Sequence, residues 1–297
     1  MRHITTRKSL AALFIAGLWI LPLALINQEY GLASLLDPVG LIAVLVPLIA
    51  VVVVTKKNDF QLWPSIFLAI GVPLGLLAAV AGFIWHLGTQ GLTGDYARVY
   101  PMTGNMLTTV LYGGVASAVG YFARKSIESE DRRVVLTRAQ GLFLSALVVG
   151  LFLLMFGMDG LMLIWEPSAL AILVSCVCTA GLINPLSRLA SAAEATIFAS
   201  LFLVVLGVIY FYFSDAEKIE PLMLTTVGLT YGIVAYLLLY FASLVYQAPF
   251  VNVSSANWHW LELCAFLIFM LYAPQTIREI QQNASEESVI EQREVEQ

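Results

Sequence analysis

The sequence contains few charged residues for its length. Only 12% of its 297 residues are Asp, Glu, Lys or Arg, about half the share in a soluble domain, whereas 60% are hydrophobic. This balance excludes an ordinary soluble protein. The net charge of −5 derives largely from the C-terminal stretch EESVIEQREVEQ. A nucleic acid is therefore not an expected partner, since its phosphates attract basic surfaces.

Cysteine and histidine are also scarce, and neither forms a recognisable pattern. All three cysteines fall inside apolar runs, where thiols usually act as small apolar fillers: Cys176, Cys178 and Cys264. The three histidines are far apart, and no pair has helical ligand spacing: His3, His86 and His259. The sequence also lacks a glycine-rich phosphate loop, a nucleophile elbow and paired carboxylates. We therefore expect no metal, no cofactor and no enzymatic activity.

The sequence does contain a series of apolar runs long enough to cross a membrane. Such runs fold as helices in lipid, because each backbone N–H and C=O must be paired within the segment. We predict an all-α polytopic membrane protein with eight spans: Ser9–Ile26, Pro38–Val54, Trp63–Leu87, Tyr100–Ala123, Ala139–Gly157, Pro167–Ile183, Ala192–Phe213 and Pro221–Tyr246.

A ninth apolar run, Trp260–Tyr272, is short and carries Glu262. It fits either a short crossing or a helix that lies at the membrane interface. The stretch NWHWLE at Asn257–Glu262 has the aromatic character of an interfacial segment, so we assign His259 to the interface.

Lysine and arginine lie mostly on one side of this arrangement. If the N-terminus is cytoplasmic, the cytoplasmic side holds Arg2, Arg7, Lys8, Lys56, Lys57, Arg124, Lys125, Arg132, Arg133, Arg138 and Arg188. The opposite side holds only Arg98 and Lys218. Because positive residues concentrate in cytoplasmic loops, we predict a multi-pass protein of the bacterial cytoplasmic (inner) membrane with a cytoplasmic N-terminus.

The chain contains an internal repeat. The phrase MLTTV occurs at Met106–Val110 and at Met223–Val227, and each copy is followed by a Tyr-Gly pair, Tyr112-Gly113 or Tyr231-Gly232. The second and sixth predicted spans both open with an acid and a proline, which suit the first turn of a helix. We predict two four-helix repeats, residues 1–133 and 134–250, followed by residues 251–297 with the ninth run and an acidic polar tail. Four crossings make the repeats parallel, unlike the inverted repeats of many secondary transporters.

The repeated unit resembles a known family. YGLASLLDPVGLIAVLVPLIAVVVV is similar to the loop and second helix of the flagellar stator A subunit, AIGVPLGLLAAVAGFIWHL to its third helix, and MLTTVLYGGVASAVGYF to its fourth. The resemblance covers nearly all of residues 8–125 and, more weakly, residues 138–246. The wider family is MotA/TolQ/ExbB, the proton-channel subunits of ion-driven envelope machines. The short segment Thr55–Trp63 replaces the large cytoplasmic domain of the stator subunit, so torque on a flagellar rotor is not expected.

The resemblance implies a partner. In this family the third and fourth helices of several subunits surround single-helix partners, which carry the ion-binding aspartate. It therefore implies a homo- or hetero-oligomer in the lipid bilayer with a single-transmembrane-helix protein that has an intramembrane Asp. Small residues allow helices to approach closely in lipid. The helix-packing candidates are Gly71, Gly75, Gly82, Gly113, Gly114, Gly120, Gly207 and Gly232. The pore-lining candidates are Thr108, Thr109, Tyr112, Thr225, Thr226 and Thr230.

Three functional hypotheses remain open at this point. The first is a subunit of an ion-driven complex that uses protons or sodium ions. The second is a non-conducting membrane scaffold or assembly factor derived from the same helical unit. The third is a small-solute transporter built on parallel repeats, which would require polar side chains deep inside the bundle.

Overall fold

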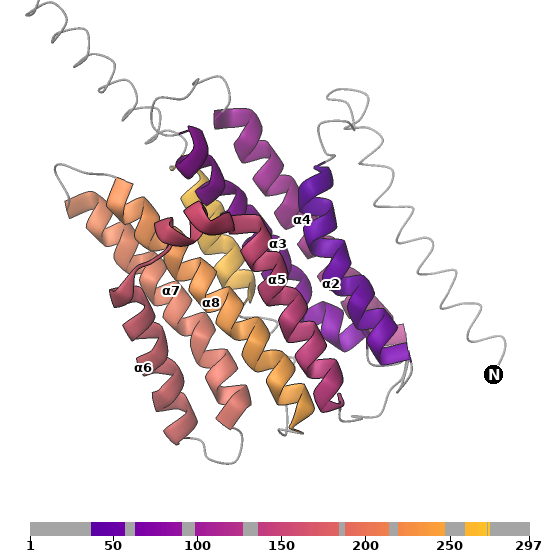
Figure 1. The fold of residues 1–297 in the computed structure, drawn as a ribbon. Helices are drawn as coiled ribbons and strands as arrows, with labels where there is room; N and C mark the ends of the chain where they lie inside the picture. The colour runs from indigo at the N-terminus through magenta and orange to yellow at the C-terminus, as the bar shows by residue number, and fades with distance from the viewer. Residues whose placement is uncertain are drawn as a thin grey trace, which may run out of the picture.

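The computed structural model describes residues 37–56, 63–90, 99–126, 136–183, 188–213, 219–246, 259–271 and 273 (Figure 1). Within these residues the regular elements are all helices and no strand occurs, so the predicted all-α fold is confirmed for them. The first predicted span, Ser9–Ile26, lies outside the described residues.

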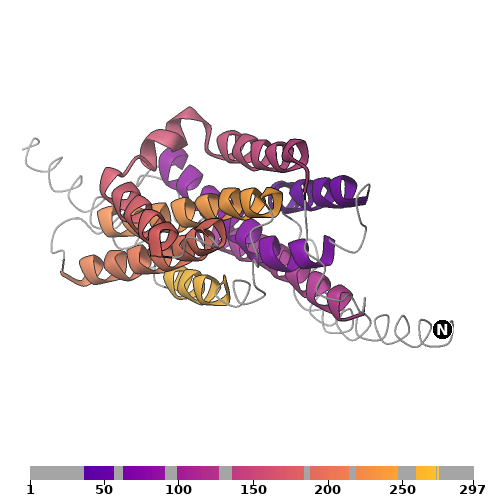
Figure 2. The same ribbon diagram turned by 90° about the horizontal axis from the view of Figure 1, so that it is seen from below.

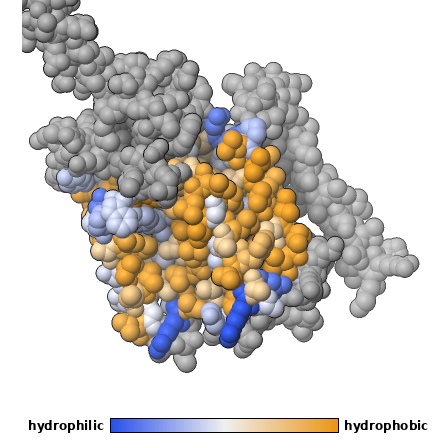
Figure 3. Space-filling model, in the orientation of Figure 1, coloured by the Kyte–Doolittle hydropathy of each residue, from blue (hydrophilic) through white to orange (hydrophobic). Residues whose placement is uncertain are grey.

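The described helices are α2 (Pro38–Lys56), α3 (Trp63–Gln90), α4 (Val99–Ser126), α5 (Arg138–Leu163), α6 (Pro167–Ile183), α7 (Arg188–Phe213), α8 (Ile219–Val245) and a C-terminal helix, His259–Leu271. Six of them, α2, α3, α4, α5, α7 and α8, are long and apolar enough to cross a membrane. The α6 helix has the bounds of the sixth predicted span, but at 17 residues it is shorter than the others, as is the C-terminal helix. Figure 3 shows a broad hydrophobic band with hydrophilic residues at its edges, as expected for a multi-pass membrane protein.

The helices form two groups of three that pack on each other. In one group α2 contacts both α3 and α4, and in the other α6 contacts both α7 and α8 (Figures 1 and 2). The groups meet where α3 contacts α8 and where α5 contacts α2, α3 and α8. The apolar stretch of α3 is 83% buried and that of α5 only 22%, so α3 lies at the centre and α5 at the rim.

The start of α5 joins the two groups. Thr137 and Gln140 form a capping box, in which Thr137 N donates to Gln140 Oε1 (2.9 Å) and Gln140 N donates to Thr137 Oγ1 (3.3 Å). Gln140 Nε2 also donates to Val54 O at the end of α2 (3.0 Å), and Leu136 N donates to Leu244 O at the end of α8 (3.0 Å). The ends of α2 and α8 and the start of α5 therefore lie at one end of the bundle.

The C-terminal helix runs along α3 and α8. Near its start, the ring of His259 contacts Tyr236 of α8, with centroids 4.2 Å apart. Near its end, Phe269 contacts Phe83, in the second half of α3, at 5.2 Å. The helix therefore follows the direction of the bundle, unlike a helix that lies flat at the interface (Figure 1).

Labelling of single cysteines tests this arrangement of helix ends. Cysteines at Val39 and Ser168, near the starts of α2 and α6, are expected to react with a membrane-impermeant maleimide from the same side. Cysteines at Lys56 and Ile183, near the ends of those helices, are expected to react from the other side. The measurement is the extent of labelling before and after the membrane is permeabilised.

The background for this experiment is a variant with Cys176, Cys178 and Cys264 replaced by alanine. Cys178 and Cys264 are exposed on the described surface, so their removal leaves the introduced cysteine as the thiol that is measured. Labelling of the Val39 and Ile183 positions from one side would contradict the arrangement.

Candidate functional site

The α3 and α4 helices touch at their backbones. A Cβ at Gly113 would lie 2.8 Å from Gly75 Cα and 2.9 Å from Gly75 N, closer than real Cβ atoms approach other heavy atoms. A Cβ at Gly71 would lie 2.8 Å from Gly113 O. Farther along the contact, a Cβ at Gly120 would lie 2.6 Å from Leu68 N. Only glycine fits at these positions, and the helices gain close van der Waals contact as a result.

Ser117 of α4 completes this contact by bonding to the backbone of α3. Its Oγ accepts a hydrogen bond from Val72 N (3.0 Å) and donates one to Leu68 O (3.3 Å). The next residue of α3, Pro73, has no N–H to pair with the carbonyl of Ala69. Tyr236 of α8 donates to that carbonyl at 3.5 Å. Polar side chains from both groups therefore pair backbone groups of the central helix.

The α7 and α8 helices make a contact of the same kind. A Cβ at Gly232 would collide with Ser200 Cβ and would lie 3.0 Å from Thr196 O. Ser200 of α7 therefore packs against Gly232 of α8, just as Gly75 of α3 packs against Gly113 of α4.

The remaining glycine candidates have different surroundings. A Cβ at Gly82 would lie 3.9 Å from the Met106 side chain, and one at Gly114 would meet nothing within 4 Å. Gly207 is buried in α7.

Thr109 and Tyr112 of α4 bind the start of α2. Thr109 Oγ1 donates to Asp37 Oδ2 (2.8 Å), and Asp37 N donates to the Tyr112 hydroxyl (3.1 Å). The other carboxylate oxygen, Oδ1, accepts a hydrogen bond from Val39 N (3.1 Å) and so caps the helix. Gly40 leaves room for this cluster, because a Cβ there would collide with Thr109 Oγ1.

Tyr231 of α8 binds the start of α6 in the same way. Glu166 N donates to the Tyr231 hydroxyl (3.3 Å), and this hydroxyl donates to Ile164 O. Glu166 Oε1 accepts a hydrogen bond from Ser168 N (3.4 Å), as an N-cap does. Each of the two Tyr-Gly pairs therefore places its tyrosine hydroxyl on the residue before a helix-starting proline.

The predicted pore-lining threonines are buried inside the helix bundle. Thr108 and Thr109 are 5% and 2% exposed, and Thr225, Thr226 and Thr230 are fully buried. Thr108 Oγ1 donates to Gly104 O (2.9 Å) and Thr230 Oγ1 to Thr226 O (2.8 Å), the backbone pairing common for threonine in membrane helices.

A buried acid–base pair in the C-terminal helix was not among the predicted site residues. His259 Nδ1 lies 2.6 Å from Glu262 Oε2, and the two residues are 1% and 0% exposed. The assignment of His259 to the membrane interface stays a prediction, whereas the structure shows that its side chain is buried and packs against Tyr236. The sequence signal was an acid inside an apolar run with a histidine one helical turn before it.

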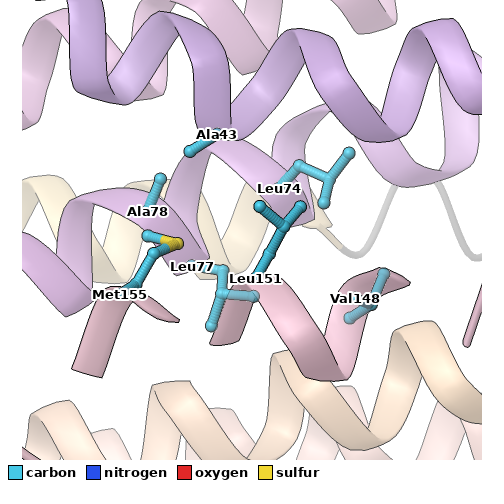
Figure 4. Close-up of a pocket in the computed structure, with 7 residues that line it drawn as sticks. All are labelled: Ala43, Leu74, Leu77, Ala78, Val148, Leu151 and Met155. Carbon is cyan, nitrogen blue, oxygen red and sulfur yellow. The ribbon is translucent and has the colours of Figure 1, made fainter. Parts of the chain in front are cut away.

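The bundle also has a small pocket between α2, α3 and α5 (Figure 4). Its lining is entirely apolar: Ala43, Leu74, Leu77, Ala78, Val148, Leu151 and Met155. It therefore offers no polar group for a ligand or ion. Among the described residues, no group of three or more His, Cys, Asp or Glu could hold a metal ion.

Comparison with known proteins provides no relative. No protein-family model, no curated protein and no solved structure matches the chain. Its function has therefore to be inferred from its own residues and their geometry.

Two neighbouring glycines of α4 provide a matched test of the backbone contact. Gly113→Ala is expected to lower the free energy of unfolding by about 1–3 kcal/mol, because the methyl group forces α3 and α4 apart. Gly114→Ala is expected to raise it by about 0.5–1 kcal/mol, because its Cβ meets no atom and alanine is the better helix former. Thermal or denaturant unfolding in detergent micelles measures both. Equal effects of the two substitutions would contradict the contact.

Proposed function

We propose that this chain is an integral membrane subunit of an ion-driven, MotA/TolQ/ExbB-like energy-transducing complex in the bacterial cytoplasmic membrane. It consists of two parallel copies of a four-helix unit and uses protons or sodium ions. It works with a single-helix partner that supplies an intramembrane aspartate.

The observation that carries the proposal is the pairing of α3 with α4. These helices contain the segments that resemble the third and fourth helices of the family, which surround the partner helix. In this chain the two segments pack backbone to backbone at Gly75 and Gly113, and Ser117 hydrogen-bonds to α3 beside them. The pairing agrees with a preserved helical unit, since two helices that keep a close contact in lipid require small residues on both contact faces.

Two recurring contacts support the duplication. The hydroxyls of Tyr112 and Tyr231 both accept a hydrogen bond from the residue before a helix-starting proline. The α4 and α8 helices both place the glycine after that tyrosine against the preceding helix of their own group. These are the pairs of residues that the sequence repeat aligns.

The distribution of positive charge supports the orientation. Lys56 ends α2, Arg138 begins α5 and Arg188 begins α7. The ends of α2 and α8 and the start of α5 meet at one end of the bundle. Arg188 belongs to this end as well, because α7 and α8 are consecutive antiparallel helices joined by a short connection (Figure 1). Positive residues favour the cytoplasmic side, so this end and the N-terminus are assigned to the cytoplasm.

Purification from native membranes tests the proposal. The full-length chain, isolated under mild conditions, is expected to bring down a protein with one transmembrane helix and an aspartate within that helix. Mass spectrometry of the purified material identifies it. Recovery of this chain alone, after chemical crosslinking in the intact membrane, would refute the proposal.

A second candidate is a non-conducting scaffold, and the hydrogen bonds of the threonines favour it. Thr109 bonds to Asp37 and to the carbonyl of Asn105, and Thr108 bonds to Gly104, so these hydroxyls are engaged within the chain. A scaffold needs such bonds for its own fold and has no need of an ion path.

Substitution of Thr108 distinguishes the two candidates. The Thr108 hydroxyl bonds to a carbonyl of its own helix, so Thr108→Val is expected to leave the fold and the expression level unchanged. An ion-conducting role predicts loss of the ion-dependent phenotype, whereas a scaffold tolerates the change. Thr109→Val is a less informative variant, because it also breaks the link to Asp37.

A further inference from the structure

We propose that His259 and Glu262 form an intramembrane proton-binding site within this chain. The two side chains lie one turn apart on the C-terminal helix, with His259 Nδ1 2.6 Å from Glu262 Oε2. This inference does not depend on the proposed function, because it concerns this chain without any partner.

The burial of this pair is costly for the fold. His259 Nε2 and Glu262 Oε1 are buried and have no hydrogen-bond partner among the residues that the structure describes. Each buried polar atom without a partner lowers the stability of the fold, and a buried ion pair commonly contributes less stability than well-packed apolar residues. Packing therefore gives no reason for an acid and a base here, whereas ionisable residues within membrane segments typically mark ion or proton paths.

The pair lies within the depth of the membrane-spanning helices. His259 packs against Tyr236, whose hydroxyl reaches Ala69 O. Ala69 is roughly 9 Å from the start of α3 and Tyr236 roughly 13 Å from the end of α8, at about 1.5 Å per helical residue. Both Ala69 and Tyr236 belong to the apolar stretches of α3 (Trp63–Ile84) and α8 (Leu224–Val245), so the pair packs against membrane-spanning segments.

The titratable groups that face the pair come from α8 and α4. The ring of Tyr236 meets His259 edge-on, and Tyr240 stacks on Tyr236 at 5.8 Å. Arg124, in the last turn of α4, acts electrostatically on Tyr240. On the side of α3, the hydroxyl of Tyr236 reaches the carbonyl of Ala69.

The chemistry of the pair suits a proton better than a metal cation. With one proton shared between them, the imidazole and the carboxyl form a pair with no net charge, which low-dielectric surroundings favour. Loss of this proton leaves a carboxylate beside a neutral imidazole, and a second proton leaves an imidazolium beside a neutral acid. A hard cation such as a sodium ion requires several oxygen ligands, and the pair provides one carboxylate.

Infrared difference spectroscopy of the full-length chain in lipid vesicles tests the site. Spectra are recorded as a function of pH between about 4 and 9, a range that includes the ordinary titration of glutamate and histidine. We expect the pH-dependent carboxylic-acid C=O stretching band of the wild-type chain to contain a component that is lost in Glu262→Gln, whereas the other acids of the chain contribute to the band in both. The matched control is Glu194→Gln, which removes a glutamate of another span and is expected to keep this component.

His259→Gln extends the test to the base. It keeps Glu262 and removes the base that shares the proton with it, so the pH dependence of the Glu262 component is expected to differ from that of the wild-type chain. This variant also serves if Glu262→Gln does not fold, as judged by gel filtration and circular dichroism.

Three results would overturn the proposal. They are a pH-dependent carboxylic-acid band that is identical in the wild-type chain and in a folded Glu262→Gln variant, a component that is lost equally in Glu194→Gln, and a folded His259→Gln variant whose Glu262 component changes at the wild-type pH. A Glu262 carboxyl whose protonation stays fixed over this pH range gives the first of these results.

Discussion

The backbone contact between α3 and α4 is the constraint on which the rest of the described fold depends. Lipid tails are as apolar as leucine side chains, so water does not drive helices together within a membrane. Close contact at Gly71, Gly75 and Gly113 provides the attraction instead. With α4 on one side, α3 has its other sides free for α2, α5, α8 and the C-terminal helix. The most buried long helix, α3, is thus also a helix that contacts its neighbour through glycine backbone.

Most of the polar side chains described above form hydrogen bonds with backbone N–H or C=O groups. Pro73 has no N–H, so the carbonyl of Ala69 lacks its usual helical partner. The hydroxyl of Tyr236 donates a hydrogen bond to this carbonyl. Asp37 and Glu166 cap helices, and the hydroxyls of Tyr112 and Tyr231 hold the same two residues. In water these groups would be solvated, but inside a membrane each must be paired within the protein. The need to pair polar groups is enough to explain the buried threonines, and it requires no ion path. Only the functional effect of replacing these threonines can show that they line such a path.

His259 and Glu262 do not follow this pattern, because each keeps a buried atom that no group in the described part of the chain pairs with. The family resemblance places the ion-binding acid on a separate single-helix protein. In this chain a short helix with its own acid lies along α3 and α8, next to one helix from each group. The proposed complex would then have an acid from the chain itself in addition to the one from its partner. The two acids need not compete, since one belongs to the interior of this chain and the other to a helix that the chain contacts.

Composition and repeat pattern alone determined the class of fold, the approximate bounds of the described helices and the residues that recur in both halves. These features are local. The length of an apolar run indicates a membrane-spanning helix, and an Asp-Pro or Glu-Pro pair marks the residue at which α2 or α6 begins. The glycine face of α3 and α4 was also visible, because small residues at helical spacing have few other uses in lipid. Only the tertiary structure decided that Tyr236 pairs the carbonyl of Ala69 and that His259 and Glu262 are buried. Burial depends on which helices cover a residue, and the spacing of residues along one helix does not contain that information.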